Sequence, residues 1–274
     1  MQVKTPSMVT LADGRKMAYD EVSPAEPKGT VLLLTGLASK RLGWYKQLEE
    51  FGRYYRTIAL DHRDVGDSDQ VSEAYTTGDQ ADDAAAVLKA LGITRAYVVG
   101  ISMGGFVSLE LALRHPEMVE KLGLTATSAG GTNHVAPAPE VTMRLVQRDY
   151  QTEVGEAARQ SYALIMAPGY CESHPQEWDM IGEIARYRPI SPAAYFRQLQ
   201  ACTGHDVWER LSQLHIPTLV VHGETDPLVP TENGRNLAKN IQGAKLILYP
   251  NTGHIPIIER AEDYNRDVLS FLES

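Results

Sequence analysis

The chain has 274 residues, 43% hydrophobic and 22% charged, a composition typical of a globular protein with one sizeable core. Its formal net charge of -9 argues against nucleic acid or an anionic membrane as a partner, because phosphate binding requires a basic surface. Two cysteines are too few for a disulfide framework, and the N-terminus lacks the pattern of a signal peptide. We therefore expect a cytoplasmic protein without membrane spans and leave its oligomeric state open.

Short aliphatic and β-branched segments alternate with amphipathic ones, which predicts a parallel sheet covered by helices. The first two strands, around Met8–Leu11 and Lys16–Glu21, flank an Asp13-Gly14 turn and form an antiparallel hairpin. Six apolar strands follow, and their character indicates burial on both faces. They are expected at Val31–Leu34, Thr57–Leu60, Tyr97–Val99, Leu122–Leu124, Leu219–Val221 and Leu246–Leu248. The fold class is thus α/β, with a mostly parallel sheet of eight strands.

Helical spacing of apolar residues predicts helices between these strands. The first, Asp79–Leu91, ends at Gly92 as a C-terminal cap. The second, Phe106–Arg114, stops before Pro116, and the third, Ala261–Leu272, closes the chain.

The interval between residues 130 and 208 breaks this alternation. It holds six of the prolines. Its three helical patches are Val141–Tyr150, Gly155–Met166 and Pro192–Ala201. We therefore expect residues 1–129 and 209–274 to form the α/β core and residues 130–208 to form a helical lid, or cap, inserted between two core strands.

The segment Gly100-Ile101-Ser102-Met103-Gly104 matches Gly-x-Ser-x-Gly between a predicted strand and a predicted helix. A serine on such a sharp turn has a strained backbone, and glycines beside it relieve crowding and expose its hydroxyl. The pentapeptide alone is a weak signal, but its strand–turn–helix context is specific. We predict Ser102 as a nucleophile, the alternative being a glycine turn with an incidental serine.

A serine hydroxyl requires a base and an orienting acid to become a good nucleophile. His254 follows the last predicted strand, so it should lie on the same carboxyl edge of the sheet as Ser102. Asp226 follows the preceding strand and can hold the imidazole in the correct tautomer. Glu224 is the nearest alternative for the acid.

These motifs, together with the Asp-His-Arg-Asp-Val-Gly-Asp-Ser segment at 61–68, make the chain resemble the α/β-hydrolase superfamily over nearly its whole length. Members of this superfamily carry the triad in the order Ser, Asp, His. The chain looks most like small carboxylesterases, enol-lactonases and methylesterases of anthracycline biosynthesis. The resemblance implies an α/β-hydrolase fold and an oxyanion hole made by the backbone N–H groups of Leu37 and Met103. A serine at position 102 separates the chain from haloalkane dehalogenases and epoxide hydrolases, which use aspartate there.

Two positions depart from the pattern of that superfamily. Thr35-Gly36 stands where His-Gly is common, a change that a backbone N–H donor tolerates. Asp64 stands where glycine is frequent. We interpret its segment as structural, with Asp61 and Arg63 bracing a turn.

Two Cys-x-x-His pairs offer ligand types found in zinc sites, Cys171 with His174 and Cys202 with His205. The pairs lie 31 residues apart in the sequence, and we interpret them as structural. The first strand is not followed by the Gly-x-Gly-x-x-Gly of a dinucleotide site. No metal and no cofactor are therefore expected.

These features predict a serine hydrolase that cleaves a small to medium, largely uncharged carboxylic ester or lactone through an acyl-enzyme on Ser102. The same residues would serve an acyltransferase, a carbon–carbon bond hydrolase or a perhydrolase, and the fold does not separate these activities. A ligand receptor without catalytic activity is a further alternative.

Overall fold

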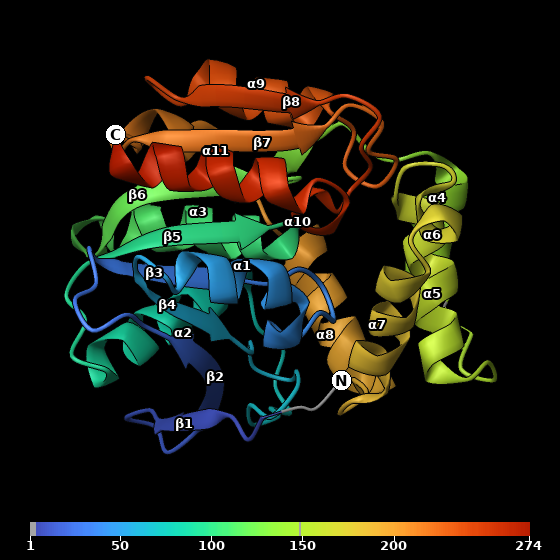
Figure 1. The fold of residues 1–274 in the computed structure, drawn as a ribbon, viewed down its shortest axis with the longest axis horizontal. Helices are drawn as coiled ribbons and strands as arrows, with labels where there is room; N and C mark the ends of the chain where they lie inside the picture. Colours follow the sequence, from blue (N-terminus) through green and yellow to red (C-terminus); the bar gives the residue numbers. More distant parts are fainter. Residues whose placement is uncertain (1–3, 148) are drawn as a thin grey trace.

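The computed structural model describes residues 4–147 and 149–274, which build one eight-stranded sheet (Figure 1). The strand order is β1-β2-β4-β3-β5-β6-β7-β8; β1–β2 and β2–β4 pair antiparallel and the other neighbours pair parallel. The bounds are β1 Ser7–Thr10, β2 Lys16–Val22, β3 Thr30–Leu34, β4 Arg56–Leu60, β5 Ala96–Ile101, β6 Val119–Thr125, β7 Thr218–Gly223 and β8 Lys245–Tyr249. The predicted hairpin and the six further strands are confirmed.

Helices cover both faces of the sheet. On one face α2 packs against α3, and on the other α1 packs against α11 (Figure 1). The bounds are α1 Tyr45–Phe51, α2 Thr77–Ala90, α3 Met103–Arg114, α4 Pro139–Val146, α5 Val154–Ile165, α6 Tyr170–Ser173, α7 Pro175–Arg186, α8 Pro192–Thr203, α9 Glu232–Asn240, α10 Pro256–Glu259 and α11 Ala261–Glu273. The helices predicted from the sequence correspond to α2, α3, α4, α5, α8 and α11, whereas α1, α6, α7, α9 and α10 were not predicted.

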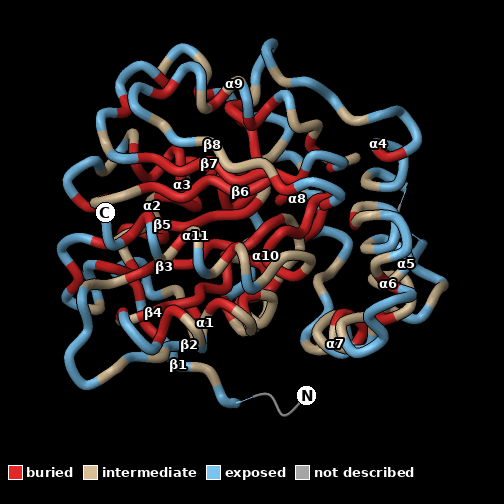
Figure 2. Tube along the Cα trace, turned by 45° about the horizontal axis from the view of Figure 1, so that its top comes forward, coloured by how far each residue is buried: buried red, intermediate tan, exposed pale blue. Residues whose placement is uncertain are grey.

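The hydrophobic core forms two layers, one on each side of the sheet, and Figure 2 shows the strands as its most buried part. Successive side chains of β3 alternate between the layers because a strand directs neighbouring residues to opposite faces. Leu32 and Leu34 pack in the layer under α2 and α3, and Val31 and Leu33 in the layer under α1 and α11. The apolar strands in the middle of the sheet are therefore buried on both faces, as predicted, whereas the edge strand β8 is only partly buried.

Local signals in the sequence set the ends of α2. Thr76 forms a capping box with Asp79, in which the Thr76 hydroxyl accepts the Asp79 N–H and the Asp79 carboxylate accepts the Thr76 N–H. At the other end Gly92 has φ +71, and the N–H of Ile93 donates to Leu88 O at 2.8 Å. The predicted glycine cap is confirmed, since a left-handed residue after the helix satisfies its last carbonyls.

Helices α4 to α8 lie between β6 and β7, in residues 130–208, which we call the inserted segment. Figure 1 shows α4 to α7 beside the ends to which the β5 and β7 arrows point. The prediction of a helix as far as Tyr150 is wrong, because α4 ends at Val146; Arg148 lies outside the described residues. The Asp149 carboxylate accepts the Gln151 N–H and the Thr152 hydroxyl, a local turn that competes with helix.

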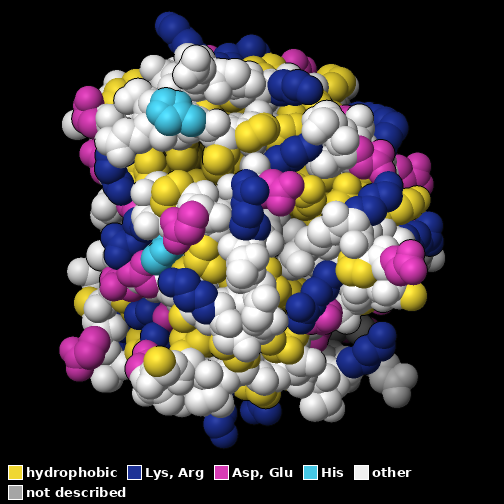
Figure 3. Space-filling view, turned by 90° about the vertical axis from the view of Figure 1, so that its left-hand side faces the viewer, with side chains coloured by type: hydrophobic (Ala, Val, Ile, Leu, Met, Phe, Trp, Pro, Cys, Tyr) yellow, Lys and Arg dark blue, Asp and Glu magenta, His cyan; other side chains and the backbone are white. Residues whose placement is uncertain are grey.

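The surface opposite the inserted segment carries both signs of charge. Figure 3 shows Lys and Arg side chains interspersed with Asp and Glu over this face. In the two described ranges, no helix is both long and apolar enough to cross a membrane.

Candidate active site

Ser102 occupies a sharp turn between β5 and α3. Its backbone has φ 55 and ψ -123, a conformation that costs a non-glycine residue about 1–3 kcal/mol. A Cβ atom on Gly100 would lie 2.2 Å from Gly104 O, and one on Gly104 would lie 2.1 Å from Leu34 O. Both positions therefore require glycine, as the motif predicts.

Hydrogen bonds from the next strand hold this strained residue in place. The Ser102 N–H donates to Thr125 O at 2.9 Å, and the Thr127 hydroxyl donates to Ser102 O at 2.8 Å. Thr125 ends β6 and Thr127 follows it, so the neighbouring strand fixes both sides of the serine. The side chain of Ser102 stays partly exposed.

His254 and Asp226 form a buried pair at the ends of β8 and β7. The imidazole Nδ1 of His254 lies 2.8 Å from Asp226 Oδ2, and the Asp226 side chain has no exposed surface. The other carboxylate oxygen, Oδ1, accepts the N–H groups of Leu228 and Val229, each at 2.9 Å. Glu224 is exposed and is not the partner of the imidazole.

The electrostatic surroundings keep Asp226 ionised. Burial alone would raise its pKa, but the nearby His254 and the hydrogen bond from His222 outweigh burial and lower the pKa to about 2. Asp226 therefore carries a full negative charge at neutral pH, next to the ring that would become an imidazolium.

His222 is a contributor that the sequence analysis did not identify. Its Nε2 lies 2.7 Å from Val229 O and 3.3 Å from Asp226 Oδ2. A carbonyl oxygen can only accept, so Nε2 carries the proton, and the ring braces the loop that holds the carboxylate. Its position in β7, at the end of an apolar run and four residues before Asp226, was the available sequence signal.

Ser102 and His254 lie on the same edge of the sheet, because β5 and β8 belong to its parallel part and both residues follow the carboxyl end of a strand. In the part of the chain that the structure describes, Ser102 Oγ makes no direct hydrogen bond to the imidazole. Such bonds are often long without substrate and tighten in the reacting complex.

The two predicted oxyanion donors flank the serine. Met103 is the first residue of α3, where backbone N–H groups have no partner within the helix. Leu37 follows Gly36, and a Cβ atom on Gly36 would lie 3.2 Å from Ser102 Cβ, so this loop runs directly past the serine. The Ser39 N–H donates to Gly36 O at 3.1 Å and closes a turn in which Ala38 has φ +58.

Thr35, the departure from the usual histidine, fastens the same loop. Its hydroxyl donates to Ser39 O at 3.0 Å, and its carbonyl oxygen lies 3.2 Å from His62 Nε2. Burial lowers the pKa of His62 to about 4, so this ring is neutral near pH 7.

Side chains of the segment 61–68 bond to other parts of the fold, which is consistent with its interpretation as structural. The buried Asp61 accepts the N–H of Arg41 at 2.7 Å, and Arg63 pairs with Asp83 of α2 at 2.6 Å. Asp64 has φ +72, which explains why glycine suits this position, and its carboxylate receives two hydrogen bonds from Arg197 of α8, both at 2.9 Å. The inserted segment is thereby joined to the core.

The histidines of the two Cys-x-x-His pairs make contacts of other kinds. The exposed His174 stacks on Tyr170, and the buried His205 stacks on Phe106 with its Nδ1 2.9 Å from the Thr77 hydroxyl. Across the described residues, no group of three His, Cys, Asp or Glu side chains could hold a metal ion.

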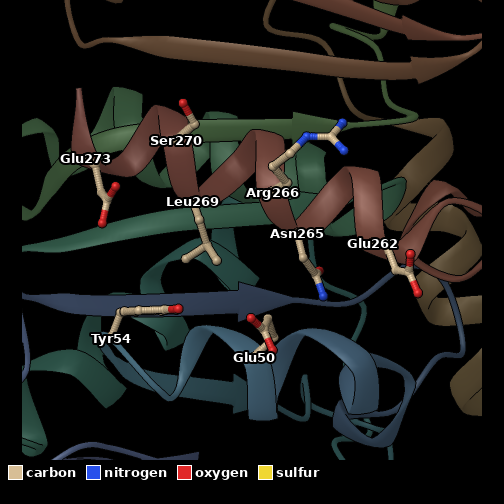
Figure 4. Close-up of a pocket in the computed structure, with 8 residues that line it drawn as sticks. All are labelled: Glu50, Tyr54, Glu262, Asn265, Arg266, Leu269, Ser270 and Glu273. Carbon is tan, nitrogen blue, oxygen red and sulfur yellow. The ribbon is translucent and has the colours of Figure 1, made fainter.

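A groove of about 610 Å³ lies away from these residues, between α1 and α11 (Figure 4). Its lining mixes apolar and polar side chains and includes three glutamates and one arginine. It consists of Glu50, Tyr54, Glu262, Asn265, Arg266, Leu269, Ser270 and Glu273. None of the predicted site residues lines this groove, so it is separate from the candidate active site.

Known proteins resemble the chain in sequence and structure. The family model of the alpha/beta hydrolase fold matches residues 29–261. The 2-hydroxy-6-oxononadienedioate/2-hydroxy-6-oxononatrienedioate hydrolase of Burkholderia vietnamiensis (strain G4 / LMG 22486) is 32% identical over 272 residues, which are 95% of this chain and 92% of that protein. A protein of Caulobacter sp. (strain K31), provisionally named carbamate hydrolase RutD, is 30% identical over 93% of this chain and 95% of its own length.

Among solved structures, the enol-lactonase from Burkholderia xenovorans LB400 matches with a TM-score of 0.86 and 25% identity, covering 98% of this chain and 100% of that one. The family model and the structural likeness agree with the eight-stranded, mostly parallel sheet and its flanking helices. The chain therefore belongs to the alpha/beta hydrolase family and is an enzyme of the hydrolase class.

Proposed function

We propose that this protein is a serine hydrolase that cleaves a small to medium carboxylic ester or lactone through a covalent acyl-enzyme on Ser102. The observation that carries the proposal is the buried Asp226–His254 pair, 2.8 Å apart, on the same sheet edge as a serine held in strained backbone. Strain of this kind is stored where it exposes a reacting group.

In the first half of the proposed reaction, Ser102 Oγ attacks the carbonyl carbon and its proton passes to His254 Nε2. The ionised Asp226 stabilises the imidazolium that forms. The carbonyl oxygen becomes an oxyanion and accepts the backbone N–H groups of Leu37 and Met103. Each donor of this kind contributes about 3–4 kcal/mol in comparable enzymes.

In the second half, the bond between the carbonyl carbon and the ester oxygen breaks. The alcohol leaves with the proton from His254, which then accepts a proton from water as the resulting hydroxide attacks the acyl-enzyme. The acid is released and Ser102 regains its proton. In a lactone the leaving alcohol stays attached to the acyl group, so a single hydroxy acid is the product. The similarity to an enol-lactonase over 98% of the chain supports this substrate class.

The relative that is 32% identical favours a second candidate, a carbon–carbon bond hydrolase. The substrate in its name is an oxo-dienedioate without an ester or amide bond, so its hydrolysis has to break a carbon–carbon bond beside the oxo group. The same nucleophile, base and oxyanion donors would serve that reaction, with a carbanion in place of an alkoxide as the leaving group.

Hydrolysis of p-nitrophenyl esters from acetate to decanoate tests the proposal, with wild type, Ser102→Ala and the exposed Ser161→Ala as a control. We expect Ser102→Ala to lose a factor of about 10⁴ or more in kcat/KM and Ser161→Ala to match wild type. A parallel assay with a 2-hydroxy-6-oxo-dienedioate separates the candidates. Turnover of that compound alone would replace the esterase proposal, and equal rates in all three proteins would refute both candidates.

A further inference from the structure

The turn Gly36–Ser39 beside Ser102 has a backbone conformation that its own sequence does not favour. Leu37 has a negative φ and Ala38 has φ +58, which is the pattern of a type II turn. That pattern calls for glycine or asparagine where Ala38 stands. A type I turn would suit alanine better, and it differs by a rotation of the Leu37–Ala38 peptide through about 180°.

Two hydrogen bonds inside the loop do not select between these two turns. The Ser39 N–H donates to Gly36 O, a bond that both turn types contain. The Thr35 hydroxyl donates to Ser39 O, which lies outside the peptide that rotates. The Ser39 hydroxyl also reaches this peptide from within the loop, but its 3.5 Å distance to Leu37 O is too long for a strong hydrogen bond. A stronger contact from another part of the molecule therefore has to determine the orientation of the Leu37–Ala38 peptide.

Gln198 of α8 supplies that contact. Its Oε1 accepts the Ala38 N–H at 2.8 Å, and its side chain is fully buried. Its Nε2 lies 3.4 Å from Arg63 O and donates to it, which fixes which end of the amide faces Ala38. Rotation of the peptide would bring Leu37 O against Gln198 Oε1, and two acceptors without a proton between them repel each other. Reversal of the amide would set Oε1 against Arg63 O.

Neighbouring contacts hold α8 and the adjacent helices against the same loop. Arg197, next to Gln198, forms the two hydrogen bonds to the buried Asp64. The Lys40 ammonium donates to Ile184 O at 3.2 Å and to Ala185 O at 3.5 Å, in the last turn of α7. The inserted segment is thus anchored to the core beside Gln198 and in the preceding helix α7.

We propose that Gln198 is a positioning residue that holds the Leu37–Ala38 peptide in the orientation required for the oxyanion site. The inference rests on the proposed function, because that function assigns the Leu37 N–H to the oxyanion. If this peptide rotated, the Leu37 carbonyl would take the place of the Ala38 N–H beside the donor. The electrostatic field at the oxyanion would then be less favourable. Loss of this positioning should destabilise the transition state rather than the bound substrate, because charge on the oxygen develops only in the transition state.

A double-mutant cycle tests this role. Gln198→Leu should lower kcat by about 10- to 100-fold and leave KM within about threefold, because the lost stabilisation acts on the transition state. Ala38→Gly alone measures the effect of the glycine while the Gln198 contact is intact. In the double variant Ala38→Gly should restore most of kcat, because glycine adopts positive φ without penalty and no longer needs the contact. Gln200→Leu, an exposed change on the same helix, is the matched control.

Hydrogen exchange at the Ala38 amide provides a readout that does not depend on activity. We expect this amide to exchange at least about tenfold faster in Gln198→Leu than in wild type, because it loses its acceptor. Gln198→Met, an unbranched side chain of similar length, replaces Gln198→Leu if that variant does not fold. Unchanged exchange in either variant would overturn the proposal.

Two further results would overturn it on the activity side. One is an unchanged kcat in Gln198→Leu, and the other is a loss of kcat that Ala38→Gly does not relieve, as simple damage to packing would give. Failure of the proposed function looks different. In that case wild-type ester hydrolysis is absent or survives Ser102→Ala, while the Ala38 amide still reports whether Gln198 holds the turn.

Discussion

The two loops that flank Ser102 are held by different parts of the molecule. On the acid side, Asp226 receives its hydrogen bonds from its own loop and from the imidazoles of His222 in β7 and His254. All of these partners belong to the sheet and its connections. The inserted segment also reaches this side. The His254 N–H donates to Ile165 O at 2.7 Å, and the Ala167 N–H donates at 2.8 Å to Glu259, which also accepts the Gly253 and Ile255 N–H groups beside His254.

On the oxyanion side, the decisive contacts come from the inserted segment. The Ala38 N–H bonds to Gln198 of α8, the Tyr162 hydroxyl of α5 interacts with the Ser39 side chain, and Lys40 donates to carbonyls in α7. Changes in α8 should therefore disturb oxyanion stabilisation before they disturb the acid and base. The acid side should respond to changes in the sheet.

The largest expected effect is on the acid side. Asp226→Asn keeps the shape but removes the charge that stabilises the imidazolium and can reverse the tautomer of His254. We expect kcat/KM to fall by about 10⁴-fold, with circular dichroism unchanged. Glu224→Gln is the control, since Glu224 is exposed and makes no bond to the imidazole. A loss smaller than about tenfold would mean that Asp226 is not the orienting acid.

Packing under the nucleophile should give the next largest effect, on stability. Gly100→Ala places a Cβ atom 2.2 Å from Gly104 O and 2.3 Å from Ser108 Oγ. Overpacking of this kind should lower the free energy of unfolding by about 1–3 kcal/mol. Gly43→Ala is the matched control, because a Cβ atom there meets nothing within 4 Å. Urea denaturation of both variants measures the difference, and equal stabilities would contradict the described turn.

The two sides should lose stability in different ranges of pH. His62, under the oxyanion loop, has its pKa lowered from 6.5 to about 4 by burial, so between these values the unfolded chain binds a proton that the folded protein does not. The free energy of unfolding should therefore fall by about 1.4 kcal/mol for each unit by which the pH is lowered in that range. Asp226, with its pKa lowered from 3.8 to about 2, contributes stability above about pH 4 that is lost as pH falls toward 2.

Urea titrations at several pH values check this difference. His62→Gln should reduce the loss between pH 6.5 and 4 without removing it, because burial also lowers the pKa of His205, to about 3. The exposed His215→Gln should leave the loss as in wild type. If the free energy of unfolding changes with pH equally in wild type and in His62→Gln, His62 is not held neutral in the folded protein.

The smallest effect should come from the position that departs from the family pattern. Thr35→Val removes the hydroxyl that donates to Ser39 O and should cost about 1 kcal/mol of stability. Because the Leu37 donor is a backbone N–H, kcat should fall by less than about tenfold. Thr35→Ser keeps the hydroxyl and should retain both properties. A greater loss of kcat in Thr35→Val than in Gln198→Leu would mean that Thr35, rather than Gln198 of α8, determines the conformation of the turn.

The sequence predicted the core of this fold well because the responsible signals are local. Alternation of apolar runs located the strands, and Gly92 marked the end of α2. Ser102 was identifiable because its glycines stand at the junction of a strand and a helix. His254 and Asp226 followed from their places after the last two strands, since parallel strands bring their carboxyl ends to one edge.

The contributions of Gln198 and His222 depend on packing between distant segments, so the sequence alone did not indicate them. Gln198 contacts Ala38, 160 residues away in the chain, and nothing in the pattern of α8 distinguishes it from other polar positions. Helix α7 was missed because the sequence analysis treated the prolines of the inserted segment as interruptions. Pro175 instead occupies the first turn of that helix, where its missing N–H costs no hydrogen bond.

The central claim is that an acyl group forms a covalent bond to Ser102 during turnover. Acid quenching of wild type during rapid turnover of a p-nitrophenyl ester, followed by mass spectrometry of proteolytic peptides, tests it directly. The account predicts that the peptide containing Ser102 gains the mass of the acyl group less one hydrogen, and that Ser102→Ala shows neither the adduct nor the turnover. Rapid turnover with the acyl group on another residue would contradict the account, and so would hydrolysis that persists in Ser102→Ala.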